Sequence, residues 1–497
     1  MNIEKVFGPP GSGKTTFLLN EVEKELASGI NSTRIGYFSF TRKAANEAKE
    51  RAIVKFPHLH EKQDFPYFRT LHSLAYMVLG TSITNMMSQE HYQEFAQQTG
   101  LEIGLSNEEE VVKADHPILN EINIARIKGI DLREHYNNSG MTIEWHHFEF
   151  VERSYRHYKA AHDLIDFTDL LELAIGRQES LPALETVIID EAQDLSRLQW
   201  QLVEILAAKA KRTYIAGDDD QAIHLWAGAD VSSFLAFTGS IRVLEKSYRV
   251  PQAVHTIANR IVNRIKTRQE KKWDPRSHEG TVQAYSRFED VAIEEGQWLI
   301  MASAGYMLNP ICEWLRNNGT LFERQGVSSI NPDIVNSVRD WEHLRKGGQI
   351  GYENVRRVYR YLGSENVARG HRTFKKGDEH AMYTLEELRD NHGLLTDAIW
   401  HVALEKISED KKAYMIAVLR RGQKFSDTSR IKVSTIHGAK GGEADNVMLL
   451  LDLSPKSSEE YWRDADNINR LFYVGVTRPR ESLHLIMPRR SDRGFQL

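Results

Sequence analysis

The chain has 497 residues, of which 41% are hydrophobic and 27% are charged, and its formal net charge is −5. This length is too great for one hydrophobic core and predicts about three or four domains. The net charge excludes a uniform polycation, so any contact with nucleic acid must depend on local basic surfaces. The only cysteine is Cys312, which excludes an internal disulfide. No apolar run approaches the roughly 20 residues that a membrane helix needs.

The first informative stretch is a glycine-rich loop that follows a short apolar segment at residues 3–7. Residues 8–15 read GPPGSGKT, which fits the phosphate-loop pattern G-x-x-x-x-G-K-[ST], and apolar residues at helical spacing follow. Between a strand and a helix N-terminus, backbone N–H groups of such a loop bind phosphate. The predicted nucleotide-binding residues are Gly8, Pro9, Pro10, Gly11, Ser12, Gly13, Lys14, Thr15 and Thr16. Kinases, motors and transport ATPases share this loop.

The next segments offer candidates for contact with nucleic acid. Residues 34–40 predict a strand and residues 41–56 a helix. Phe40 at the strand end could stack on a base and Thr41 could hold a phosphate, whereas a core role for Phe40 is the alternative. His72 lies in TLHS, where phosphate binding and helix capping are both open. Residues 81–160 are polar with a helical pattern and predict an inserted subdomain, after which Asp166 and Thr168 fit helix caps.

An acidic pair follows a run of β-branched residues in the segment VIIDEAQD, residues 187–194. The run predicts a buried parallel strand, and ligands bind at the carboxyl ends of such strands. Asp190 is expected to hold Mg²⁺ with Thr15, and Glu191 to orient and deprotonate an attacking water. A kinase need not activate water, so the pair favours hydrolysis over transfer. A surface Asp-Glu pair is the structural alternative.

Three later segments add candidates for a coupled ATP and nucleic-acid site. A strand at residues 214–217 leads to Gln221, a candidate sensor of the γ-phosphate, and then to His224 and Trp226, which could stack on bases. Tyr248 and Arg249 fit an adenine-stacking ring beside a phosphate-binding cation, although a surface pair is equally consistent. Arg478 follows a helical run and is a candidate arginine finger, worth about 10³–10⁵ in rate.

A second α/β pattern begins at residue 280 and is interrupted by charged helical sequence at residues 328–425. It begins with residues 280–285 and 297–302, resumes at residues 430–443, and continues with predicted strands at residues 446–451 and 482–487. The interruption carries a basic-aromatic group that fits either a DNA contact or a solvated helix face. This group comprises Arg356, Arg357, Tyr359, Arg360, Tyr361, Arg369, Arg372, Lys375 and Lys376.

The motifs, taken in order, resemble those of the UvrD/Rep-type superfamily 1 DNA helicases. They read GPPGSGKT, FSFTRKAA, TLHS, IIDEAQD, AGDDDQAIHLWAGA, LEKSYR, VSTIHGAKGGE and LFYVGVTRPR. The resemblance implies an α/β fold with two RecA-like parallel-sheet P-loop domains, each carrying a mainly helical inserted subdomain. The implied limits are 1–80 and 163–250 for the first core domain, 81–162 for its insert, 251–327 and 426–497 for the second core domain, and 328–425 for a reduced, basic-aromatic insert.

The same resemblance implies an ATP-dependent single-stranded-DNA translocase and 3′→5′ helicase that uses ATP and Mg²⁺. It implies Gln221 as the γ-phosphate sensor, Tyr248 on adenine, Arg249 and Arg478 on the γ-phosphate, and Glu443 on the ribose. The implied DNA-binding residues are Phe40, Thr41, His72, His224, Trp226 and His437. Expected partners are single-stranded DNA, junctions of single and double strands, and replication or repair proteins, with no membrane. The expected location is the cytoplasm of a bacterial or phage-infected cell, at the nucleoid when on DNA.

Several departures from the family pattern qualify these expectations. Seven residues precede the loop, too few for the family's upstream glutamine that reads adenine, so the choice of ATP over GTP stays open. His224, Ala227, Ser247 and Gly442 stand where the family usually has Tyr, Arg, Asn and Leu. The short second insert favours an alternative, a translocase that strips proteins from DNA with little unwinding. A small-molecule kinase and a non-catalytic loading protein are remoter alternatives, against which the complete hydrolytic set argues.

Overall fold

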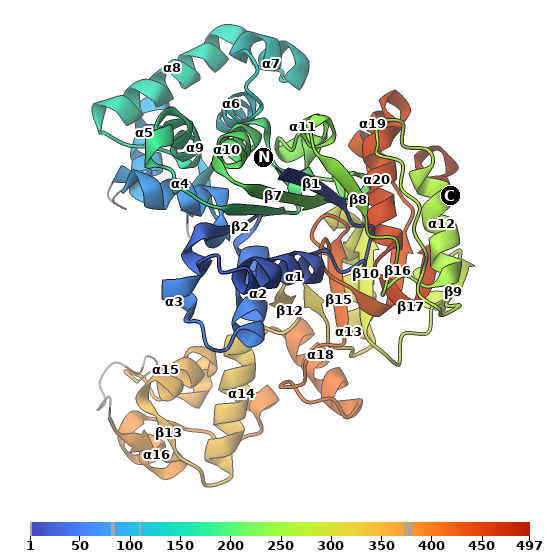
Figure 1. The fold of residues 1–497 in the computed structure, drawn as a ribbon. Coiled ribbons are helices and arrows are strands. Elements are labelled where there is room, and N and C mark those ends of the chain that lie inside the picture. The colour runs from blue at the N-terminus through green and yellow to red at the C-terminus, as the bar shows by residue number, and fades with distance from the viewer. Residues whose placement is uncertain (1, 81–84, 109–110, 372–373, 375–379) are drawn as a thin grey trace. The chain divides into compact units, whose positions relative to one another are not determined.

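The computed structural model describes residues 2–80, 85–108, 111–371, 374 and 380–497. It contains two units, Met1–Gly280 with Glu459–Arg478, and Thr281–Ser458 with Pro479–Gln496. Each unit is built on a largely parallel sheet, which confirms the predicted α/β fold class (Figure 1). The predicted domain limits stay predictions, and within the first unit α12 (Gln252–Val262) packs against α20 (Ala465–Val476). Helix α19 (Pro455–Arg463) leads into α20.

The sheet of the first unit has six parallel strands in the order β3-β2-β6-β7-β1-β8. Their bounds are β1 (Asn2–Phe7), β2 (Ile35–Ser39), β3 (Phe68–Thr70), β6 (Thr186–Asp190), β7 (Arg212–Gly217) and β8 (Ser240–Val243). The strands that the apolar runs predicted are therefore confirmed. Strand β8 was not predicted, because it is a short edge strand whose residues are mostly exposed.

Helices cover both faces of this sheet, so neighbouring strand residues such as Ile188 and Ile189 are buried on opposite sides. One face packs against α1 (Lys14–Ala27) and α2 (Arg42–Lys55). The other face packs against α4 (Leu71–Leu79), α9 (Phe167–Gly176), α10 (Arg197–Lys209) and α11 (Val231–Ala236), as Figure 1 shows. This double cover explains why the central strands read as continuous apolar runs.

The inserted subdomain of the first unit has its own core, which includes Phe95, Ile122, Phe148 and Tyr155. Its helices are α5 (Gln89–Thr99), α6 (Pro117–Lys128), α7 (Leu132–Ser139) and α8 (Trp145–Ala161). An antiparallel hairpin of β4 (Gly104–Glu108) and β5 (Val111–Asp115) lies between α5 and α6, so the insert is mainly helical. The hairpin itself was not predicted, because cross-strand pairing leaves little trace in a short polar segment. Helix α3 (Glu61–Asp64) precedes the insert.

The sheet of the second unit has the order β12-β11-β15-β10-β16-β17-β9, parallel except for the β11–β12 pair. Its strands are β9 (Thr281–Tyr285), β10 (Trp298–Ala302), β11 (Glu323–Arg324), β12 (Val327–Ser328), β15 (Ile431–Thr435), β16 (Ala444–Leu450) and β17 (Pro479–Ile486). Its helices are α13 (Asn309–Asn317), α14 (Pro332–Arg345), α15 (Tyr352–Tyr361), α16 (Leu385–His392), α17 (Trp400–Ala403) and α18 (Glu409–Arg420). A two-residue pair, β13 (Ile350–Gly351) with β14 (Met382–Tyr383), lies in its insert.

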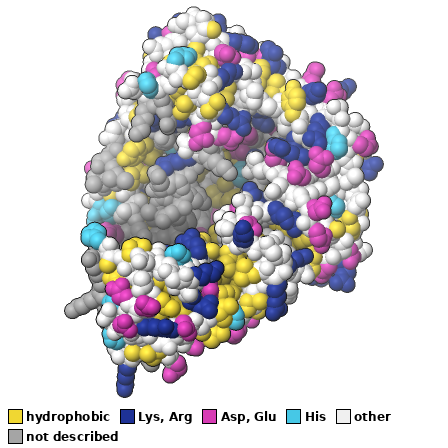
Figure 2. Space-filling model, turned by 90° about the horizontal axis from the view of Figure 1, so that it is seen from below, with side chains coloured by type: hydrophobic (Ala, Val, Ile, Leu, Met, Phe, Trp, Pro, Cys, Tyr) yellow, Lys and Arg dark blue, Asp and Glu magenta, His cyan; other side chains and the backbone are white. Residues whose placement is uncertain are grey.

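Some residues of the basic-aromatic group form contacts inside that insert. Tyr359 is buried, and its hydroxyl donates to the His392 carbonyl at 3.1 Å. Arg357 is paired with the buried Asp340 at 2.6 Å. Arg372, Lys375 and Lys376 lie outside the described residues. On the face seen in Figure 2, Lys and Arg side chains are interspersed with Asp and Glu rather than gathered in one field. Within the described chain, no helix has the length and apolar character of a membrane span.

Candidate functional site

The phosphate loop joins β1 to α1 through two glycines in the left-handed region, Gly11 at φ 71° and Gly13 at φ 78°. Gly13 is the N-cap residue of α1. A Cβ at Gly11 would lie 2.4 Å from the Cβ of Arg249, so both the backbone angle and the close approach require glycine. The loop is thus packed directly against the segment that carries Tyr248 and Arg249.

The loop has the donors that a phosphate group needs. The Ser12 hydroxyl is buried, and it has no hydrogen-bond partner among the described residues. The Lys14 ammonium lies over the loop and donates to the Gly8 carbonyl at 2.9 Å. Thr16 is exposed in the first turn of α1, where backbone N–H groups lack partners within the helix. A phosphate anion fits this set of an unpartnered hydroxyl, a cation and free N–H groups.

Asp190, at the end of β6, meets Thr15 as the sequence predicted for a magnesium site. The Thr15 hydroxyl donates to Asp190 Oδ2 at 3.2 Å, and the buried Tyr37 hydroxyl donates to the same oxygen at 2.7 Å. Burial, followed by the neighbouring charge of Glu191, raises the pKa of Asp190 to about 6. A divalent cation would offset this unfavourable buried charge, and two hard oxygen ligands suit Mg²⁺.

Glu191 has an unusual backbone conformation for a residue other than glycine, with φ at 54°. This conformation costs roughly 1–2 kcal/mol, and such costs concentrate at functional sites. Its carboxylate accepts from Gln193 Nε2 at 2.5 Å. The buried Gln193 also accepts from the Asp218 backbone N–H at 2.9 Å, and a Cβ at Gly217 would lie only 2.6 Å from Gln193 Oε1. Gln193 therefore ties the acid at the end of β6 to the end of β7.

The connection continues from Asp218 to Arg478. Gln221 Nε2 donates to Asp218 Oδ2 at 2.6 Å, and Arg478 Nη2 donates to Gln221 Oε1 at 2.8 Å. The Arg478 side chain is only 2% exposed, and its Nε donates to the Val474 carbonyl at 2.8 Å. Three predicted catalytic residues therefore belong to one chain of hydrogen bonds, which runs Glu191, Gln193, Asp218, Gln221, Arg478. No role was predicted for Gln193, although its place in the DEAQD segment was a usable signal.

Tyr248 and Arg249 are held at the loop by backbone contacts. The Tyr248 N–H donates to the Gly11 carbonyl at 2.9 Å, and the Ser247 hydroxyl donates to the Pro10 carbonyl at 2.7 Å. The Tyr248 residue is 68% exposed, and the Lys246 ammonium lies 5.8 Å from its ring centroid. An exposed ring fixed beside a phosphate site fits the stacking of a flat base.

A cluster of three buried carboxylates, Asp218, Asp219 and Asp220, follows β7. Their oxygens lie within 4.8 Å of one another, a spacing that a metal ion could bridge. The cation in this cluster is instead Lys271, which pairs with Asp219 and lies 3.2 Å from Asp218 and 2.8 Å from Asp220. Arg268 binds Asp220 through two hydrogen bonds of 2.8 and 2.7 Å. Neither cation was predicted, since no local pattern links Lys271 or Arg268 to residues some 50 positions earlier.

Replacing Lys271 by methionine should destabilise the first unit by about 3–5 kcal/mol, because it leaves buried carboxylates without their cation. Urea unfolding at neutral pH measures this loss. Burial already raises the pKa of Asp219 to about 6. A carboxyl group whose pKa is raised in the folded state stabilises that state at low pH, and this contribution is lost as the pH rises through that pKa. The difference in unfolding free energy between wild type and Lys271→Met should therefore shrink toward pH 5, where the carboxylate takes up a proton. The control is Arg51→Met, whose pair with Glu47 is exposed on both sides and predicts a loss of about 0–1 kcal/mol. An equal loss in both variants would contradict the prediction.

Three of the predicted DNA-binding residues form one aromatic cluster in the first unit. The rings of Phe40 and His224 are stacked with centroids 5.7 Å apart, and His224 lies 6.3 Å from Trp226. Trp226 is 67% exposed, while Phe40 also packs partly against the core. Thr41 is the N-cap of α2 and accepts from the Ala44 N–H at 3.2 Å. The structure therefore brings Phe40, His224 and Trp226 together and gives Thr41 a capping role.

The remaining predicted residues have other surroundings, each within its own unit. The His72 ring stacks on Phe167 with centroids 3.8 Å apart and an interplanar angle of 9°. In the second unit, the half-buried His437 follows β15. Glu443 precedes β16 and forms an ion pair with Arg480. The roles of Glu443 on ribose and of His437 on DNA stay predictions.

Comparison with known proteins gives matches in both units, over most of the first and part of the second. A family model described as the UvrD/REP helicase N-terminal domain matches residues 3–242, and one described as the UvrD-like helicase C-terminal domain matches residues 403–490. The ATP-dependent DNA helicase PcrA of Bacillus subtilis is 27% identical over 311 residues, 58% of this chain and 41% of PcrA. A probable DNA helicase of Mycoplasma pneumoniae is 28% identical over 303 residues, 54% of each chain. PcrA of Staphylococcus aureus (strain NCTC 8325 / PS 47) is 25% identical over 280 residues, 52% of this chain and 38% of PcrA. The matched region thus spans about half, or less, of these relatives.

Proposed function

We propose that the chain, which belongs to the UvrD/Rep-type DNA helicase family, is an ATP-dependent helicase. We further propose that it translocates 3′→5′ along single-stranded DNA. One observation carries the proposal. Gln221, bonded to Arg478, lies three positions before His224, whose ring stacks on Phe40. A group proposed to sense ATP and a ring proposed to hold DNA therefore share one short segment.

In the proposed hydrolysis, the residues around the loop act on the terminal phosphate. Lys14, Arg249 and Arg478 stabilise negative charge on the γ-phosphoryl group as it is transferred. Glu191 orients the attacking water and accepts its proton, while Gln193 holds the carboxylate in place. Thr15 and Asp190 would hold Mg²⁺, which when bound neutralises charge on the β- and γ-phosphates. Tyr248 stacks on the base, and Glu443 binds the ribose.

In the proposed stepping, the DNA strand is gripped by stacking. Bases stack on Trp226, His224 and Phe40, with His437 and His72 as further contacts. When ATP is hydrolysed, Gln221 exchanges its hydrogen-bond partners, and the segment 222–226 transmits that change to the rings. The proposed substrates are single strands and their junctions with duplex, in the cytoplasm and at the nucleoid when the protein is bound to DNA. Replication or repair proteins are the proposed partners.

A second candidate function is a translocase that removes proteins from single strands with little unwinding. One observation favours it: Arg357 and Tyr359, which a duplex-binding insert could present, are used inside the insert itself. This candidate keeps the same ATP site and the same aromatic grip.

The test compares duplexes that carry a single-stranded tail at either the 3′ or the 5′ end, with streptavidin on a biotinylated single strand as a second substrate. The proposed helicase should separate the 3′-tailed duplex only, and only with hydrolysable ATP. Streptavidin displacement without strand separation would select the second candidate. Separation of 5′-tailed duplexes would contradict the proposed polarity, and no ATP-dependent displacement on any substrate would contradict both candidates.

A further inference from the structure

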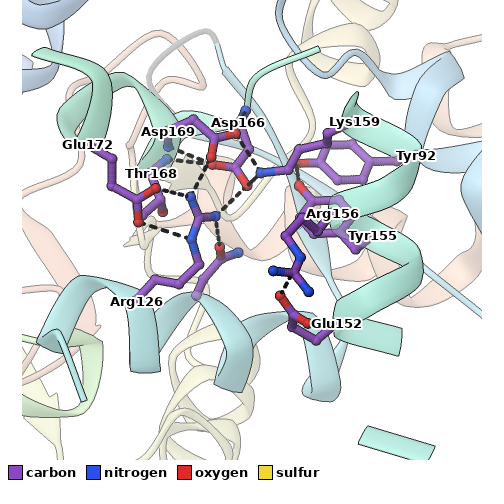
Figure 3. A network of polar contacts seen from close by, with 11 residues as sticks. Tyr92, Arg126, Glu152, Tyr155, Arg156, Lys159, Asp166, Thr168, Asp169 and Glu172 are labelled. Carbon is purple, nitrogen blue, oxygen red and sulfur yellow. Dashed lines mark hydrogen bonds and ion pairs between the residues drawn. The ribbon is translucent and has the colours of Figure 1, made fainter. Parts of the chain in front are cut away.

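A buried charge cluster joins the inserted subdomain of the first unit to α9, and we call it the anchor cluster (Figure 3). Its basic members come from the insert, Arg126 on α6 and Lys159 on α8. Of its acidic members, Asp166 is the N-cap of α9, Asp169 lies in the first turn and Glu172 lies near the middle of the helix. Arg126 contacts Asp166 at 2.8 Å, Asp169 at 2.5 Å and Glu172 at 2.8 Å. Lys159 contacts Asp166 at 2.6 Å and Asp169 at 2.5 Å.

The environment of the anchor cluster makes its geometry specific. Asp166 and Lys159 are buried, and the Lys159 ammonium lies 4.8 Å from the ring centroid of Tyr155. A guanidinium fork that binds several carboxylates fixes the direction of approach as well as the distance. A buried ion pair that loses one partner leaves an uncompensated charge, so the cluster favours the arrangement in which all of its members meet. The cluster is therefore suited to hold the insert in one orientation on α9.

The same carboxylates also fix the first turn of α9. Asp166 accepts from the Asp169 N–H at 2.8 Å, and Asp169 accepts from the Asp166 N–H at 2.7 Å, a reciprocal capping box. Phe167 is the first residue of α9, between the two caps. Its ring stacks on His72, and α4, which carries His72, packs along α9. Asp166 of the anchor cluster is thus the neighbour in sequence of Phe167, whose ring covers one face of His72.

We propose that Arg126 and Lys159 are positioning residues for DNA: they lock α9 against the insert, and the capped Phe167 then fixes His72 in the orientation that meets the strand. This inference rests on the proposed contact of His72 with DNA. It predicts that loss of an anchor residue weakens DNA binding through Phe167 without changing the chemistry of ATP hydrolysis.

The test uses Arg126→Met, with Arg156→Met as the matched control. Arg156 lies on the neighbouring α8, its side chain is 72% exposed, and it pairs with Glu152 at 3.4 Å (Figure 3). The readouts are the concentration of oligo-dT that gives half-maximal ATPase stimulation, the turnover at saturating oligo-dT, and the turnover without DNA. Arg126→Met should raise the half-maximal concentration at least about fivefold. Both turnover values should stay within about twofold of wild type, and Arg156→Met should match wild type in all three.

A double-mutant cycle with Phe167→Leu tests the route. If Arg126 acts through Phe167, the double variant should bind DNA no more weakly than the worse single variant, whereas additive losses would overturn the route. Arg126→Lys keeps the charge and loses the fork, so it serves in the cycle if Arg126→Met does not fold. If the wild-type protein and Arg126→Met bind oligo-dT equally well, this inference alone is overturned. Wild-type protein that shows no binding would overturn the proposed function with it.

Discussion

Replacing Arg478 by alanine should lower ATP turnover at saturating single-stranded DNA by about 10³–10⁵-fold. The Arg478 side chain is buried, and its Nη2 donates to Gln221 Oε1 at 2.8 Å. The substitution removes a guanidinium that would meet developing charge on the γ-phosphate, and it also releases Gln221. Steady-state phosphate release measures the loss, and a single-turnover experiment separates the chemical step from product release.

Two further variants distinguish this effect from a general loss of positive charge. Arg490→Ala removes an exposed arginine that pairs only locally, at 2.7 Å, with Asp492, so its turnover should equal that of wild type. Arg478→Lys keeps a charge but lacks the planar fork, and it should remain closer to the alanine variant than to wild type. Turnover of Arg478→Ala within tenfold of wild type would remove Arg478 from the active site.

The second large effect is expected for Glu191→Gln, which should reduce turnover by about 10²–10⁴-fold. Glutamine has the same shape but is a poor proton acceptor, so the attacking water is no longer deprotonated. Nucleotide affinity should be retained, because the phosphate loop and its contacts with Tyr248 are untouched. The measurement combines phosphate release with equilibrium binding of a fluorescent ATP analogue.

The matched control is Glu204→Gln, an exposed glutamate on α10, which should behave as wild type in both measurements. Loss of nucleotide binding in Glu191→Gln would mean that the residue supports the fold of the site. Unchanged turnover would instead mean that another group activates the water.

Local patterns were sufficient to predict the scaffold, and they placed candidate residues at the strand ends whose roles stay predictions. The run 187–189 predicted β6 because a strand covered on both faces must be apolar throughout. Gly11, Gly13 and Lys14 were predictable because a phosphate loop is a contiguous structure whose backbone angles demand particular residues. Asp190 and Thr15 were paired by their expected chemistry, and the structure places them 3.2 Å apart.

Contacts between distant residues were not predictable in the same way. Lys271 is 52 positions from Asp219, and Arg126 is 40 positions from Asp166, so no periodicity connects them. A buried cation also resembles a surface cation in sequence, because burial depends on what packs around it. The assignment of α20 to the first unit has the same origin, since it depends on packing against α12 rather than on its own sequence.

The most direct test of the central claim is the ATP turnover of the wild-type protein with single-stranded DNA, with single-stranded RNA and without polymer. The claim is that the Gln221–Arg478 contact and the rings of His224 and Trp226 are coupled, so that DNA bound on the rings changes the rate of ATP hydrolysis. It predicts that single-stranded DNA stimulates turnover and that Trp226→Ala abolishes the stimulation while leaving turnover without DNA unchanged. Equal turnover with and without DNA, or full stimulation of Trp226→Ala by DNA, would contradict it, and equal stimulation by RNA would contradict the proposed preference for DNA.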